Sequence, residues 1–179
     1  MRAVHSCGAL ILALCLLFSS CGAVSPPPAA ADILTAMQAA LTETAQPLPD
    51  GLIYTRTRSP EDPFHFSEAR FSALYGEAAR GLLAGDEGHP PAVGDAAVFL
   101  SAAPYPCEMA VFRCSDVRSA ATVAGLCRGR VDTVIRGYAE SEWEAVAAGG
   151  CVAVEGCYVF LVIAEAPEKI LAKGREMVQ

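Results

Sequence analysis

The stretch CVAVEGCYVFLVI, residues 151–163, decides the fold of this chain. Residues 151–154 and 157–163 have the apolar, β-branched and aromatic composition of strands, and Glu155-Gly156 between them is a tight-turn pair. The second segment is almost continuously apolar, which is typical of a strand that is covered on both faces. We therefore expect an antiparallel hairpin whose second strand lies inside a sheet.

The register of this hairpin follows from the turn. A two-residue Glu155-Gly156 loop places Val154 opposite Cys157 and Cys151 opposite Phe160. Because side chains alternate across a sheet, this register gives two sets of residues. One face carries Val152, Val154, Cys157, Val159, Leu161 and Ile163, and the other carries Cys151, Tyr158 and Phe160. Cys151 and Cys157 then lie on opposite faces and cannot form a disulfide.

A second hairpin is predicted upstream, from strands at 96–101 and 107–114 joined by a proline-bounded turn. A long helix follows, capped by Ser115 or Asp116. Its predicted apolar stripe consists of Val117, Ala121, Ala124, Cys127, Val131, Ile135 and Tyr138. Pro167 suits the first position of a last helix, which turns Ile170, Gly174 and Met177 inward.

The order hairpin, helix, hairpin, helix predicts an α+β fold. We expect a four-stranded antiparallel sheet built from two hairpin–helix units, ββαββα-like, with both long helices on one face. One or two helices precede it, the first opening at Asp32 and the second spanning about 67–75. The intervening residues 52–66 are polar and proline-punctuated, which indicates a loop that can include a short edge strand at 52–57.

The N-terminus, MRAVHSCGALILALCLLFSSCG, has the pattern of a bacterial lipoprotein signal peptide. The apolar run 7–18 is shorter than the ~20 residues that span a bilayer. Two serines precede Cys21, which is the predicted site of acylation by fatty acids such as palmitate; Cys15 fits poorly because Leu14 precedes it. The alternatives are an uncleaved anchor helix or an ordinary secretory signal.

Three segments result from this interpretation. Residues 1–20 are the signal peptide, 21–31 are the lipidated cysteine and a proline- and alanine-rich tether, and 32–179 form one α+β domain. The expected location is the extracytoplasmic face of the cell membrane, held by the N-terminal lipid.

Charge agrees with attachment through lipid. The 179-residue chain carries a net charge of −7, and removal of 1–20 takes away only Arg2, which leaves −8. An acidic chain has no electrostatic attraction to nucleic acid or to an anionic bilayer. Nucleic acid is therefore excluded as a partner, whereas an envelope protein, a peptide or a small solute is not.

Five cysteines follow the tether: Cys107, Cys114, Cys127, Cys151 and Cys157. They are either small buried hydrophobes or members of at most two disulfides. A bridge between the hairpins, such as Cys114 with Cys151, stays open as an alternative.

Several segments resemble one family. These are Leu74-Tyr75-Gly76, PCEMAVFR at 106–113, GYAESEW at 137–143 and VEGCYVFLVI at 154–163. Together they resemble a bacterial lipoprotein family catalogued as domain of unknown function 4358 (DUF4358). The resemblance implies the location and the fold, and the family brings no established activity or catalytic residues.

No catalytic constellation is evident. The chain after the signal peptide has two histidines, His65 and His89, both in proline-flanked loops, and no G-x-S-x-G motif or phosphate-binding glycine loop. No C-x-x-C pair suggests zinc, so we expect neither a metal nor another cofactor.

Three residues are candidates for a ligand or surface site: Glu108, Tyr138 and Trp143. For Glu108 the alternative is a carboxylate in solvent or one paired with an arginine of the long helix. For the two aromatic residues it is burial in the core. The sequence favours a non-enzymatic binding domain; the alternative is a cysteine-dependent enzyme or thiol redox protein using Cys107, Cys114 or Cys151.

Overall fold

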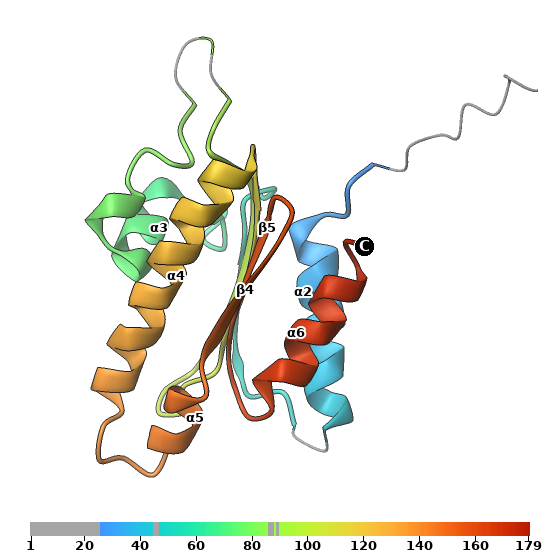
Figure 1. Ribbon diagram of the computed structural model, residues 1–179. Helices are drawn as coiled ribbons and strands as arrows, with labels where there is room; N and C mark the ends of the chain where they lie inside the picture. The colour runs from blue at the N-terminus through green and yellow to red at the C-terminus, as the bar shows by residue number, and fades with distance from the viewer. Residues whose placement is uncertain (1–25, 45–46, 86–87, 89) are drawn as a thin grey trace, which may run out of the picture.

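A computed structural model describes residues 26–44, 47–85, 88 and 90–179. It contains one antiparallel sheet with helices on both faces (Figure 1). The strand order is β1-β2-β3-β5-β4. The strands are β1 (Gly51–Thr55), β2 (Val93–Ser101), β3 (Glu108–Cys114), β4 (Cys151–Glu155) and β5 (Tyr158–Ile163). The α+β class is confirmed; the predicted signal peptide and Cys21 lie outside the described residues.

The sheet has five strands rather than four. The additional strand is β1, which pairs with β2 from Gly51↔Ser101 to Thr55↔Ala97. The short edge strand expected within the loop region 52–66 is therefore present, and the chain after Thr55 is a loop. The hairpin β2–β3 and the hairpin β4–β5 are both present, and β3 pairs with β5 to join them.

The second hairpin has a different register from the predicted one. Val154 pairs with Val159 and Glu155 with Tyr158, so the two-residue loop is Gly156-Cys157 and the predicted Glu155-Gly156 loop is wrong. Gly156 has φ +55° at the first loop position, where a type II′ turn favours glycine. Each residue of β4 therefore pairs with a partner two positions later than predicted. Two residues are one full period of a strand, so the predicted faces are unchanged: Cys151 and Val152 lie on opposite faces, as do Tyr158 and Val159.

The helices cover both faces of the sheet. Figure 1 shows α4 (Val117–Gly137) and α3 (Glu68–Tyr75) on one side, and α2 (Ala30–Glu43) and α6 (Pro167–Glu176) on the other. The expectation that both long helices share one face is wrong. The reason is that β3 and β5 are apolar on both faces: Phe112 and Leu161 pack toward α4, whereas Val111 and Phe160 pack toward α2 and α6.

Helix α4 begins as predicted, with the Asp116 carboxylate accepting a hydrogen bond from the Ser119 amide at 2.8 Å. Its buried residues are Ala120, Val123, Ala124, Cys127, Val131 and Val134. The predicted stripe was correct in its second half but not at its start, because Val117 is 68% exposed. In α6, Ile170 and Gly174 are buried as expected, whereas Met177 lies at the exposed C-cap.

Helix α2 begins at Ala30, two residues before the predicted cap Asp32. The residue at its N-cap position is Ala29, which has no side chain able to accept a hydrogen bond. The carboxylate of Asp95, at the start of β2, accepts from the Ala30 amide instead, at 2.9 Å. The tyrosine hydroxyl of Tyr158 donates to the carbonyl of Pro28, also at 2.9 Å. The segment before α2 is thus bound to two strands.

The remaining elements are short: the 3₁₀ turn Glu77–Ala79 after α3, and α5 (Glu144–Ala148) after α4. In the part of the chain that the structure describes, no helix combines the length and apolar character needed to cross a bilayer.

Candidate functional site

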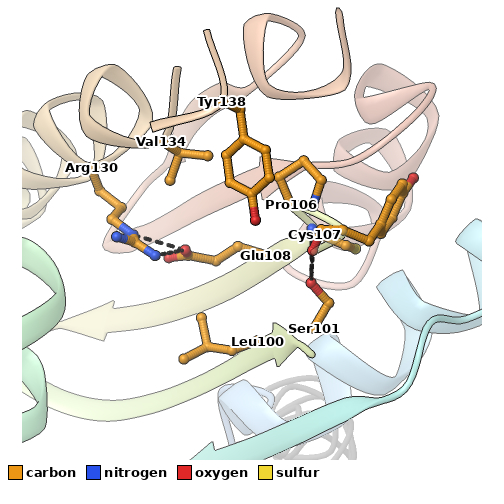
Figure 2. A pocket seen from close by; sticks show the side chains of 9 residues that line it. Leu100, Ser101, Pro106, Cys107, Glu108, Arg130, Val134 and Tyr138 are labelled. Atoms are coloured by element: carbon orange, nitrogen blue, oxygen red, sulfur yellow. Dashed lines mark hydrogen bonds and ion pairs between the residues drawn. The ribbon is translucent and has the colours of Figure 1, made fainter. Parts of the chain in front are cut away.

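A pocket of about 180 Å³ lies where the end of β2 and the start of β3 meet the C-terminal half of α4. Figure 2 shows its lining side chains, among them Glu108 on β3, Arg130 and Val134 on α4, and Tyr138 at the C-cap of that helix. Two of the three predicted site residues, Glu108 and Tyr138, therefore lie in one pocket.

Glu108 is buried, with 3% of its surface exposed. Its Oε2 accepts a hydrogen bond from Nε of Arg130 at 2.9 Å, and Nη2 of the same guanidinium lies 2.8 Å from Oε2 as an ion pair. Its Oε1 accepts a hydrogen bond from the hydroxyl of Tyr75, at 3.0 Å. Of the readings open for Glu108, pairing with an arginine of the long helix is the one present. The site is thus a carboxylate whose charge is matched by a guanidinium at low solvent exposure.

Tyr75 reaches Glu108 from α3 through an aromatic cluster. Its ring packs edge-on against Phe112 at a centroid distance of 5.4 Å and against Phe71 at 5.3 Å. Burial raises the pKa of Tyr75 well above its ordinary value, and the negative charge of Glu108 adds to this effect. The phenol therefore stays protonated and donates to the carboxylate.

Trp143 does not line this pocket. Its ring packs edge-on against Tyr105 at 4.9 Å and 90°, and Tyr105 is part of the pocket wall. On its other side, Trp143 borders a second, shallower hollow of about 380 Å³ together with Glu165 and Pro167. Trp143 is thus half-buried between two hollows rather than a plug in the core.

The turn between β2 and β3 is held by Ser101. Its hydroxyl donates to the carbonyl of Tyr105 and accepts from the Cys107 amide, the latter at 3.0 Å. These bonds fix the segment that carries Tyr105 and Pro106 into the pocket wall. Ser101, Tyr105, Tyr75 and Arg130 were not predicted as site residues. The long helix carries four arginines, Arg118, Arg128, Arg130 and Arg136, and the helical pattern does not single out Arg130 among them.

The five described cysteines are free thiols. Burial raises the pKa of Cys107 and of Cys114 to about 12 and that of Cys151 to about 11. Burial also raises the pKa of Cys127 well above its ordinary value. A bridge between Cys114 and Cys151 is absent, because Cys114 packs on the α4 side of the sheet and Cys151 on the α2 side.

The structure describes one of the two histidines that could act as a base for these thiols. His65 lies in the loop after β1, where its Nδ1 is 2.8 Å from the carbonyl oxygen of Arg58; His89 is outside the described residues. Among the residues that the structure places, no three histidine, cysteine or acidic side chains cluster in a way that could hold a metal ion.

Comparison of the chain with protein-family models, with curated proteins and with solved structures finds no match. The resemblance to DUF4358 therefore stays a prediction.

Replacement of the buried carboxylate should destabilise the domain. Glu108→Gln leaves the Arg130 guanidinium beside a neutral amide, and we expect the free energy of unfolding in urea to fall by about 2–3 kcal/mol. Tyr75→Phe removes one hydrogen bond and should cost about 1–2 kcal/mol. The control is Glu77→Gln, which breaks an exposed ion pair with Arg80 and should change stability by less than about 0.5 kcal/mol. Equal effects of the two glutamine substitutions would contradict the assignment.

The thiols of Cys107 and Cys151 should react slowly in the folded protein. A pKa of about 11 for Cys151 and about 12 for Cys107 leaves very little thiolate at pH 8. We expect alkylation by iodoacetamide to be at least about a hundredfold slower than in urea, and to accelerate as the pH rises. Mass spectrometry of timed samples gives the rate for each residue. A folded-state rate close to the rate in urea would favour the cysteine-dependent alternative.

Proposed function

We propose that this chain is a lipid-anchored bacterial lipoprotein on the extracytoplasmic face of the cell membrane, whose α+β domain binds a small solute, or part of a peptide or envelope protein, without catalysis. The N-terminal pattern before Cys21 supports the anchor. The tether after Cys21 contains three consecutive prolines, which favour an extended chain.

The observation that carries the proposal is the position of the pocket relative to the N-terminal segment. Pro28 and Ala30 are bound by Tyr158 and Asp95, at the starts of β5 and β2. Asp95 pairs with Arg113, whereas Glu108 lies five residues away along β3, which is about 17 Å at the rise of a strand. In Figure 1 the N-terminal segment leaves the domain at the end opposite α5. The pocket thus lies at the end of the domain far from the point where the N-terminal segment leaves it.

The size of the pocket limits its occupant. A volume of about 180 Å³ is below the range of roughly 300–1,000 Å³ that is usual for drug-sized ligands. It accommodates a molecule of amino-acid size or one side chain of a longer peptide. Glu108 is already paired with Arg130, so Tyr138, whose ring projects into the pocket in Figure 2, is a polar group that an occupant meets.

The cysteine-dependent alternative has less support. Cys107 contributes to the pocket wall, but its raised pKa and the adjacent Glu108 carboxylate both disfavour a thiolate there. A thiol nucleophile also needs a base within hydrogen-bonding distance. Binding without covalent chemistry therefore agrees best with this set of side chains.

The anchor is tested by removing its attachment point. Cys21→Ser should move the protein from the membrane to the soluble extracytoplasmic fraction, because burial of acyl chains is what holds an acidic domain at the bilayer. Cell fractionation with immunoblotting measures the distribution. Cys15→Ser is the matched control and should stay with the membrane. Retention of the Cys21→Ser variant in the membrane fraction would refute the anchor.

The fluorescence of Trp143 can report binding in the pocket, because Trp143 is the only tryptophan of the chain and its ring contacts Tyr105 in the pocket wall. We expect a saturable change in its fluorescence when the detergent-solubilised full chain is titrated with one of a panel of free amino acids and dipeptides. Val134→Phe fills the pocket and should abolish the response. Val154→Phe, at an exposed position on the edge strand β4, should retain it. Equal responses of the two variants, or no saturation with any probe, would contradict binding in this pocket.

A further inference from the structure

Two cysteines face each other across neighbouring strands. The pairing of β3 with β5 runs from Glu108↔Ile163 to Arg113↔Tyr158, and the next position in this register places Cys114 opposite Cys157. The Cys114 amide donates a hydrogen bond to the carbonyl of Cys157 at 2.8 Å, so the ladder continues to this pair. The sequence had suggested Cys151 as a partner for Cys114, and the register brings Cys157 there instead.

The alternation of the strand assigns both side chains to the same face of the sheet. Cys114 packs in the cluster under α4, as does Phe112 two residues before it. Val159 is in the same cluster, and Cys157 is two residues before Val159 in the register. The electrostatics agree with thiols that lie close together. Burial is the main cause of the raised pKa of Cys114, and the charge of Cys157 is the second cause.

The spacing of the backbone suits a disulfide. Residues in a hydrogen-bonded antiparallel pair have Cα atoms about 5.5 Å apart. Disulfides join cysteines whose Cα atoms are about 4.4–6.8 Å apart. The bridge therefore needs side-chain rotation and no shift of the strands.

We infer that Cys114 and Cys157 are a disulfide-forming pair, which an external disulfide, such as oxidised glutathione or the disulfide of a thiol oxidase, converts into an intrachain bridge. Cys157 is half-buried in the β4–β5 turn and is accessible to the oxidant, whereas Cys114 is 6% exposed. The Cys157 thiol loses its proton and its sulfur attacks the external disulfide, which releases one external thiol. The Cys114 sulfur, after loss of its own proton, then attacks Sγ of Cys157 in this mixed disulfide. The second external thiol leaves, so the oxidant gains the two electrons that the pair loses.

The other cysteines that the structure describes compete poorly for either partner. Cys151 packs on the opposite face of the sheet. Cys107 precedes β3 at the far end of that strand. Cys127 is fully buried on α4, in the helical layer, where no external disulfide reaches it.

The test is oxidation of the folded full chain, in detergent, with oxidised glutathione at pH 8, followed by blocking of free thiols and digestion with trypsin and Glu-C endoprotease. Both enzymes are needed, because a tryptic peptide alone contains Cys151 as well as Cys157, and cleavage after Glu155 separates them. We expect a cross-linked species of peptides 114–118 and 156–165 that is two hydrogen atoms lighter than its two components.

Three variants make the result specific. Cys114→Ser and Cys157→Ser should each abolish the cross-linked species, and Cys151→Ser should leave its yield unchanged. Circular dichroism confirms that each variant is folded, and the position of Cys157 in a surface turn makes its serine variant the safer of the two. Absence of the cross-link in the folded wild-type chain, or a cross-link from Cys114 to Cys151 or to Cys127, would overturn the inference.

This readout does not depend on the lipid anchor. The proposed extracytoplasmic location would supply the oxidising conditions in cells, but the purified chain is oxidised by a defined reagent. Failure of the cross-link therefore refutes the cysteine pair alone, and failure of the Cys21→Ser fractionation refutes the anchor alone.

Discussion

The structure depends on the need to cover both faces of β5. Every residue of this strand is buried, and its side chains alternate between two separate clusters. A strand of this kind has to lie inside the sheet and between two helical layers. This explains why α4 occupies one face and the pair α2 and α6 the other, and why α2 packs against α6 although it is remote from it in sequence.

The sequence was a good guide to local structure and to which residues of a strand share a face of the sheet. The Asp116 cap, the Ser67–Gly76 helix and the start of α6 at Pro167 depend on neighbouring residues and were all predictable. The position of the β4–β5 turn was predicted only to within one residue, because Glu155-Gly156 and Gly156-Cys157 are both plausible two-residue loops. No local sequence pattern encodes which face of the sheet each helix covers. The same holds for the contact of Ala30 with Asp95, which joins residues far apart in the sequence.

The same distinction applies to the site. Glu108 was identifiable because a carboxylate at the start of an apolar strand requires an explanation, and Tyr138 because it ends the long helix. Their partners were not identifiable in the same way. Tyr75 is 33 residues from Glu108 in sequence and Arg130 is 22 residues away, and only the packing of α3 and α4 on the sheet brings them to one carboxylate. The pairing of the Glu108 charge therefore depends on the tertiary structure and cannot be predicted from local sequence.

The contacts of Pro28 and Ala30 have a mechanical consequence. Tension applied to the chain before Pro28 reaches the domain through Tyr158 on β5 and through Asp95 on β2. Both are interior strands with a hydrogen-bonded neighbour on each side. An edge strand such as β4 could be peeled away one hydrogen bond at a time, but an interior strand has to break two ladders together. A pull on the N-terminal segment is thus distributed over the middle of the sheet, far from the walls of the pocket.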